Sequence, residues 1–121
     1  MKISDRVILP LVGSAFQSGK AAEAIEKIED KELAQIAQGE YYFFSAQAEK
    51  CVETVKDYLD HDDVMLRLSA DMLYTFANLT LGDPQAAQRT REDVHQCLTQ
   101  AMQEDAPVNV KAACLFAFYV I

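Results

Sequence analysis

The stretch from Val64 to Leu81 is the feature that most limits what this chain can fold into. Its apolar residues recur every three or four positions, which is the period of an α-helix and not of a β-strand. Two such lines run side by side, with Val64, Leu68, Met72, Phe76 and Leu79 in one and Met65, Ser69, Leu73, Ala77 and Thr80 in the other. Because the apolar face is so wide, we expect this helix to be packed between other helices on two sides.

A tight turn and a second helix follow. Gly82 ends the first helix, and Asp83-Pro84 begins the next one, with Asp83 as its cap and Pro84 at its first helical position. This second helix is expected over 84–103. Its inward-facing residues are expected to be Ala87, Thr90, Val94, Leu98 and Ala101. A helix, a turn and an antiparallel helix therefore form the basic unit of the chain.

The same unit recurs along the chain. The pattern Ala48, Cys51, Val55 and Leu59 maps onto Ala87, Thr90, Val94 and Leu98 with a constant offset of about 39 residues. Further helices are expected over 5–17, 20–28, 31–44, 48–59 and 108–121, the first of them regular only from about Leu9 because of Pro10. The helix pairs are 5–29, 31–60 and 63–104, followed by an incomplete unit at 107–121. We predict one all-α domain over 1–121, a short right-handed solenoid of antiparallel helix pairs of the tetratricopeptide class, with a compact helical bundle as the alternative.

The composition excludes several classes of function. The formal net charge of −8 repels phosphate, so direct nucleic-acid binding by this chain is not expected. The apolar end, 112–121, is far shorter than the ~20 residues of a membrane-spanning helix, and the first residues lack the pattern of a signal peptide. Cys51, Cys97 and Cys114 form no paired motif, which predicts buried, reduced cysteines and a cytoplasmic protein.

No pattern indicates catalysis, a cofactor or a metal site. The acidic run from Asp60 to Asp63 around His61 has no glycine turn and no alternating oxygen ligands, so we interpret it as a helix exit followed by a helix cap. Neither a GxxxxGK[ST] loop nor a GxGxxG loop is present. We therefore expect that the protein is not an enzyme.

Part of the chain resembles a known family. In the unit that begins at Lys31, Gly39, Tyr42 and Cys51 stand where the tetratricopeptide pattern has its small residue, its tyrosine and its alanine, whereas Gln35, Val55 and Asp63 depart from that pattern. The segments GEYYFFSAQAEKCVE and LRLSADMLYTFANLTLGDPQAAQ resemble the helical-repeat region of LuxR-type bacterial transcription regulators, including the large activators of the maltose-regulator kind. The resemblance covers 34–99. It implies signal sensing or protein contact, with the nucleotide-binding and DNA-binding parts outside this segment.

A polar stripe is the candidate binding site. Arg67, Asp71, Tyr74 and Asn78 follow one another at helical spacing, apart from the apolar lines. The first helix of each pair lines the concave groove of helical-repeat proteins, where a peptide or a small effector can lie. We therefore predict these four residues, extended by Tyr41, as partner- or effector-binding residues. The alternative is a solvated face on which Arg67 and Asp71, one turn apart, pair with each other.

Two functions remain open. The first is a non-catalytic sensing and interaction segment of a LuxR-type regulator, which binds a partner or effector and relays the change to a DNA-binding domain elsewhere. The second is a stand-alone tetratricopeptide-like adaptor that binds a peptide. The apolar run that ends at Ile121 suggests a fragment cut inside the next repeat unit, and exposed apolar helix ends of this kind could form a homodimer.

Overall fold

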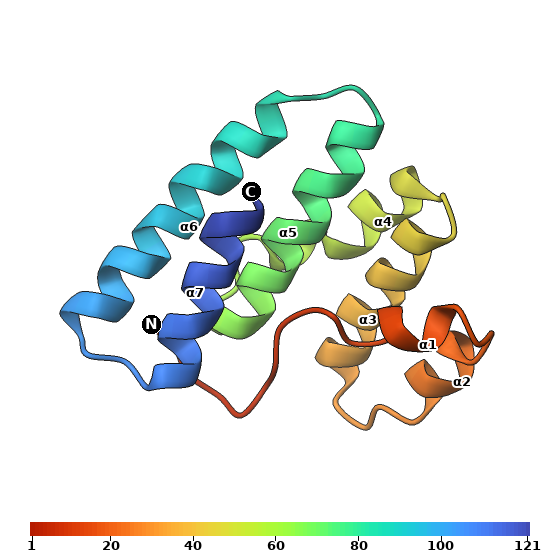
Figure 1. Ribbon diagram of the computed structural model, residues 1–121, viewed down its shortest axis with the longest axis horizontal. Helices are drawn as coiled ribbons and strands as arrows, with labels where there is room; N and C mark the ends of the chain where they lie inside the picture. The colour runs from red at the N-terminus through yellow and green to blue at the C-terminus, as the bar shows by residue number, and fades with distance from the viewer.

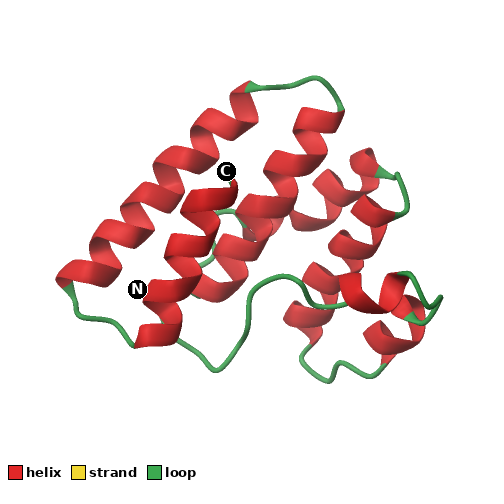
Figure 2. Cartoon of the chain, in the orientation of Figure 1, coloured by secondary structure: helices red, strands yellow, loops and turns green.

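The computed structural model describes residues 1–121, and the predicted all-α class is confirmed (Figures 1 and 2). The helices are α1 (Gly13–Phe16), α2 (Ala21–Glu26), α3 (Lys31–Phe44), α4 (Ala48–Val55), the short 3-10 helix η1 (Lys56–Tyr58), α5 (Val64–Thr80), α6 (Gln85–Gln103) and α7 (Val108–Val120). All seven α-helices lie inside segments that the periodicity marked as helical, although α1 fills only a small part of its segment. None of them combines the length and the hydropathy that a membrane crossing requires.

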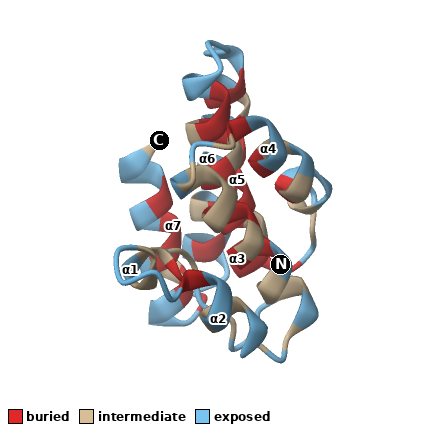
Figure 3. Ribbon diagram, turned by 90° about the vertical axis from the view of Figure 1, so that its right-hand side faces the viewer, coloured by how far each residue is buried: buried red, intermediate tan, exposed pale blue.

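Helix α5 is the centre of the structure, as its wide apolar face predicted. It contacts α3 and α4 on one side and α6 and α7 on the other. Twelve of its 17 residues are buried, and the buried residues in Figure 3 are concentrated along it. Its first turn is capped by Asp63, whose carboxylate accepts the Met65 N–H at 3.0 Å, so the predicted cap is confirmed.

The longer helices follow one another in an alternating arrangement. Figure 1 shows α3, α5 and α7 side by side and running in the same direction, with α5 in the middle. Helices α4 and α6 run the opposite way and pack against α5 without touching each other. Two buried clusters meet at α5, one shared with α3 and α4 and one shared with α6 and α7. Helices α3 and α7 have no contact with each other, because α5 lies between them.

The predicted helix over 5–17 is wrong for most of its length. Only Gly13–Phe16 is helical, and the chain before it is an extended segment that crosses from α7 to α3 (Figure 1). Pro10 has no N–H, and the N–H groups of Leu9, Leu11 and Val12 are accepted by side chains of α3 and α5 instead of by a helical turn. These tertiary acceptors replace the hydrogen bonds of a helix, so apolar residues at helical spacing stay extended.

The remaining helix predictions differ from the structure by smaller amounts. The predicted helix 31–44 matches α3, and its N-cap Asp30 accepts the N–H groups of Glu32 and Leu33. The predicted helix 48–59 divides into α4 and η1, and 20–28 shortens to α2. Helix α6 begins at Gln85 with Pro84 as its N-cap, one residue later than predicted, although the Gln85 N–H does donate to the Asp83 carboxylate at 3.1 Å. The predicted buried cysteines are confirmed, and all three thiols are free.

Candidate functional site

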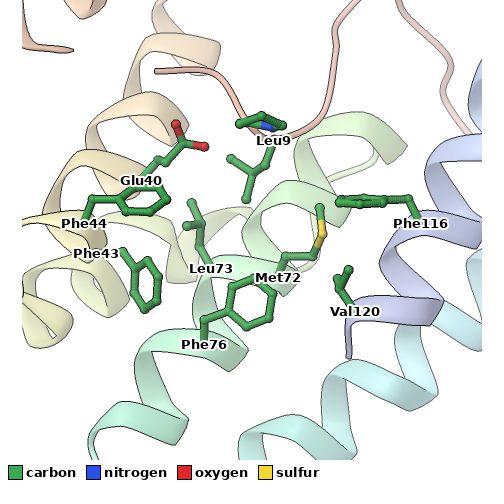
Figure 4. Close-up of a pocket in the computed structure, with 10 residues that line it drawn as sticks. Leu9, Glu40, Phe43, Phe44, Met72, Leu73, Phe76, Phe116 and Val120 are labelled. Carbon is green, nitrogen blue, oxygen red and sulfur yellow. The ribbon is translucent and has the colours of Figure 1, made fainter. Parts of the chain in front are cut away.

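An apolar trough lies along α5, between α3 and α7 (Figure 4). Its volume is about 210 Å³. Eight of the ten residues that line it are hydrophobic. They are contributed by α3 (Glu40, Phe43, Phe44), α5 (Met72, Leu73, Phe76), α7 (Phe116, Val120) and the chain before α1 (Leu9, Pro10). Large side chains on both walls remain open to solvent, with Phe44 50 % exposed and Phe116 45 % exposed.

Helix geometry places these side chains together. Phe43 and Phe44 belong to the last turn of α3, Phe76 to the second half of α5 and Phe116 to the second half of α7. Because the three helices run in the same direction, their C-terminal halves lie at the same end of the trough (Figure 1). The rings of Phe43 and Phe76 lie 6.0 Å apart, centroid to centroid, and connect α3 to α5 across the floor.

The chemistry of the trough suits an apolar group. Glu40 is its one ionisable residue, and the Glu40 carboxylate already accepts the N–H groups of Leu11 at 3.1 Å and Val12 at 2.6 Å. An apolar cavity of about 150 Å³ in another protein is large enough to hold benzene. The trough can therefore accept one ring or one branched aliphatic side chain, and its single carboxylate is already engaged by backbone N–H groups.

The chain before α1 closes one end of the trough. We refer to Met1–Pro10 as the strap. Its residues Leu9 and Pro10 line the trough, and the Leu9 N–H donates to the Ser69 hydroxyl at 3.3 Å. Near its start, Lys2 pairs through its backbone with the turn before α5, by hydrogen bonds to Asp62 and Val64 of 3.2 and 3.1 Å.

A group of carboxylates holds the middle of the strap. The Arg6 guanidinium contacts Asp30 at 2.6 Å, Asp63 at 2.9 Å and Glu32 at 3.0 Å, and we call these three residues the arginine socket. His61 lies against the same group, with its Nε2 atom 2.8 Å from Glu32. The hydrogen bond from Arg6 lowers the pKa of Asp30. Burial raises the pKa of Asp63, but hydrogen bonds from Ser4 and Arg6 outweigh burial, so the pKa of Asp63 is also lowered. The socket therefore holds charged carboxylates around one cation.

The predicted polar stripe is not an open surface. Asp71 is 0 % exposed and Asn78 is also buried, so the expected surface position is wrong for both. Arg67 and Phe76 are nine residues apart, two and a half helical turns, and so point to opposite sides of α5. The stripe therefore faces away from the trough. Arg67 and Asp71 contact α6, and Tyr74 packs against the buried cluster shared with α3 and α4.

Arg67 and Asp71 of this stripe pair with residues of α6 instead of with each other. The Nε atom of Arg67 donates to Asp93 at 2.9 Å, and Arg89 contacts Asp71 at 3.5 Å. Burial, and then the hydrogen bond and charge of Asp93, raise the pKa of Asp71 to about 9. Asn78 donates to the Tyr74 carbonyl at 2.8 Å within α5. The two contacts with Asp93 and Arg89 stabilise the packing of α6 on α5, and apolar periodicity within one helix does not predict them.

Tyr41 lies outside the trough as well. Its ring packs edge-on against Phe16 with centroids 5.8 Å apart and belongs to the small core under α1 and α2. Phe43, two residues further along α3, does line the trough. Tyr41 therefore belongs to a core, and Phe43 belongs to the trough.

The sequence contained one signal that points to the trough. Glu40 falls on the apolar side of α3, in register with Ile36, Phe43 and Phe44, and it is 1 % exposed. A carboxylate buried at an apolar position must be satisfied by partners from elsewhere in the fold. That position therefore predicts a segment docked on α3, which the structure identifies as the junction of the strap and α1.

Comparison with known proteins adds no relative. No protein family, no curated protein and no solved structure matches this chain. The structure also contains no group of three or more histidine, cysteine, aspartate or glutamate residues arranged to hold a metal ion.

Proposed function

We propose that this chain is a non-catalytic interaction segment that binds a protein or peptide partner in the trough between α3 and α7. The observation that supports this most directly is the trough itself, an apolar recess of about 210 Å³ with phenylalanine walls that are half exposed. Partner-binding surfaces are commonly anchored by aromatic side chains in such recesses.

We propose further that the alternating helices form a short solenoid of the tetratricopeptide class. The support is that each of the helices from α3 onward packs against its successor, and that α3, α5 and α7 form one continuous row. The concave row of first helices is where such solenoids bind extended ligands. Contact between α4 and α6 is missing, so the second row is less continuous than the first.

The regulatory role follows from the resemblance between 34–99 and LuxR-type bacterial regulators. In that role the segment acts in the cytoplasm and senses a partner or effector. An occupant of the trough touches α3, α5 and α7 at once, so it would favour one spacing of these helices over another and pass that change to a DNA-binding domain. The parent gene beyond the codon for Ile121 tests this role, because a downstream helix-turn-helix is expected for the regulator and is absent from the adaptor.

Selection from a displayed library of random peptides tests the binding site directly. We expect the selected peptides to contain an aromatic or branched aliphatic residue and to lose at least about tenfold in affinity when Phe116 is replaced by Ser. Tyr119→Ser is the matched control, because Tyr119 is on the same helix, is 86 % exposed and does not line the trough. Equal affinities for the Phe116→Ser and unaltered chains would contradict the proposed site.

A further inference from the structure

We propose that the strap is a built-in substitute for the partner peptide, and that the partner is an extended peptide with an arginine three residues before an apolar residue. This proposal rests on the proposed function of the trough. It adds the chemical class of the partner and a competition between the partner and Met1–Pro10.

The strap is held as a bound peptide is held. It has no helix, and its one backbone pairing is the short bridge between Lys2 and the turn before α5. Apart from a hydrogen bond from the Arg6 N–H to Ser4, its remaining polar contacts are made to side chains elsewhere in the chain. Five of its ten residues are exposed, Val7 by 56 %. Met1, Ile8 and Leu9 pack against the buried clusters but are only partly buried themselves, so the strap can detach without separating α5 from its neighbouring helices.

The arginine socket determines the charge of any replacement. Three carboxylates converge on one guanidinium, and Asp63 is completely buried. If the strap left, these carboxylates would lack a cation, so a partner that takes its place must bring one. The planar fork of arginine fits best, because the Nε and Nη2 atoms of Arg6 both reach Asp30, at 2.6 and 3.2 Å.

The socket and the trough form one continuous path. Arg6 occupies the socket, and three residues later Leu9 enters the end of the trough and contacts both large core clusters. An extended chain covers about 10 Å in three residues, so one peptide can reach both places. The partner pattern that fits is therefore an arginine, two intervening residues and an apolar residue, continuing toward Phe76 and Phe116.

Competition with a synthetic strap tests the proposal in the full chain. The probe is a fluorescent peptide with the sequence of residues 1–10, MKISDRVILP, and its binding is measured by anisotropy. We expect at least about tenfold tighter binding to the Arg6→Ala chain than to the unaltered chain, whose own strap competes at a high effective concentration. A probe with alanine in place of its arginine is expected to bind neither chain. The Lys2→Ala chain is the control, because the hydrogen bonds of Lys2 to Asp62 and Val64 are made by its backbone and not by its side chain.

Amide exchange and circular dichroism make each outcome decisive. Faster exchange at Leu9 in a folded Arg6→Ala chain is expected, and Arg6→Gln replaces this variant if it does not fold. A folded variant with a released strap that does not bind the probe would overturn the proposal, while library peptides that still bind would leave the trough as the site. Unchanged exchange at Leu9 would also overturn it, because Arg6 would then not hold the strap. Loss of both the probe and the library peptides would overturn both proposals.

Discussion

Asp71 is a carboxyl group that the fold buries completely between α5 and α6. Its pKa is raised to about 9 by burial and by Asp93, whereas the same group in the unfolded chain has an ordinary value near 4. Between these values the folded chain binds one more proton than the unfolded chain, so the free energy of unfolding falls as the pH rises. We predict that Asp71→Asn removes this dependence, whose slope is at most about 1.4 kcal/mol per pH unit, in urea unfolding between about pH 5 and pH 8.

Asp93 provides the contrasting variant. Burial opposes ionisation of Asp93, but hydrogen bonds from Arg67 and Asp71 outweigh it and keep the pKa of Asp93 below its ordinary value. Asp93→Asn removes the charge that pairs with Arg67 and is expected to lower the free energy of unfolding by about 1–3 kcal/mol at neutral pH.

The outcome that would contradict the prediction for Asp71 is a loss of stability in Asp71→Asn that is the same at every pH. Asp71 would then be ionised in the folded chain.

Gly39 allows α3 to approach α4 closely. A Cβ atom at this position would lie 2.5 Å from Cγ1 of Val55, a side chain that is fully buried. Alanine has a higher helix propensity by about 1 kcal/mol, but the clash in a packed core costs about 1–3 kcal/mol. We predict a net loss of stability for Gly39→Ala in urea unfolding. Val55→Ala should relieve the clash, so the double variant is expected to lose less stability than the sum of the two single variants.

At the scale of elements, Glu40 attaches the chain around α1 to α3. Its carboxylate accepts the N–H groups of Leu11 and Val12. In a glutamine one of the two acceptor oxygens is replaced by an NH₂ group, which cannot accept a hydrogen bond from these N–H groups. We predict that Glu40→Gln costs about 1–3 kcal/mol and speeds amide exchange at Leu11 and Val12, while exchange in α6 changes little. The control is Glu53→Gln, because Glu53 is exposed and pairs only with Lys56. Unchanged exchange at Val12 would show that Glu40 does not hold this junction.

The elements also show what the sequence could and could not predict. From Lys31 onward each helix buries one face against a sequential neighbour, so apolar periodicity was enough to locate it. The chain before α1 has a similar spacing, yet it is extended because Ser69 and Glu40, from distant positions, accept the N–H groups of Leu9, Leu11 and Val12. In the same way, Asp71 looked like a surface residue because its partner Arg89 lies on another helix. Periodicity reports which face is apolar, but it does not report which polar residues find buried partners.

At the scale of the whole molecule, the trough results from the order of the helices and not from any local motif. Helix α5 separates α3 from α7 by its own width, so aromatic residues far apart in the sequence face one another across it. Phe44 and Phe116 each resemble an ordinary core residue when they are read on their own helix. Only the arrangement of three parallel helices leaves them half exposed on the two walls of one recess.

A second apolar surface lies on the outer side of α7. Val108, Ala112, Leu115 and Tyr119 recur at helical spacing, and all four are exposed. No neighbouring helix covers this stripe, so association through it would remove apolar surface from water. We predict that the chain self-associates as its concentration rises, which sedimentation velocity would detect.

Two variants of α7 test whether this stripe is the contact. Leu115→Glu should keep the chain monomeric because it places a charge in the stripe, whereas Phe116→Ser, which changes the trough, should leave self-association unchanged. A chain that stays monomeric at every concentration, or a Leu115→Glu variant that associates as the unaltered chain does, would show that the stripe is not the contact.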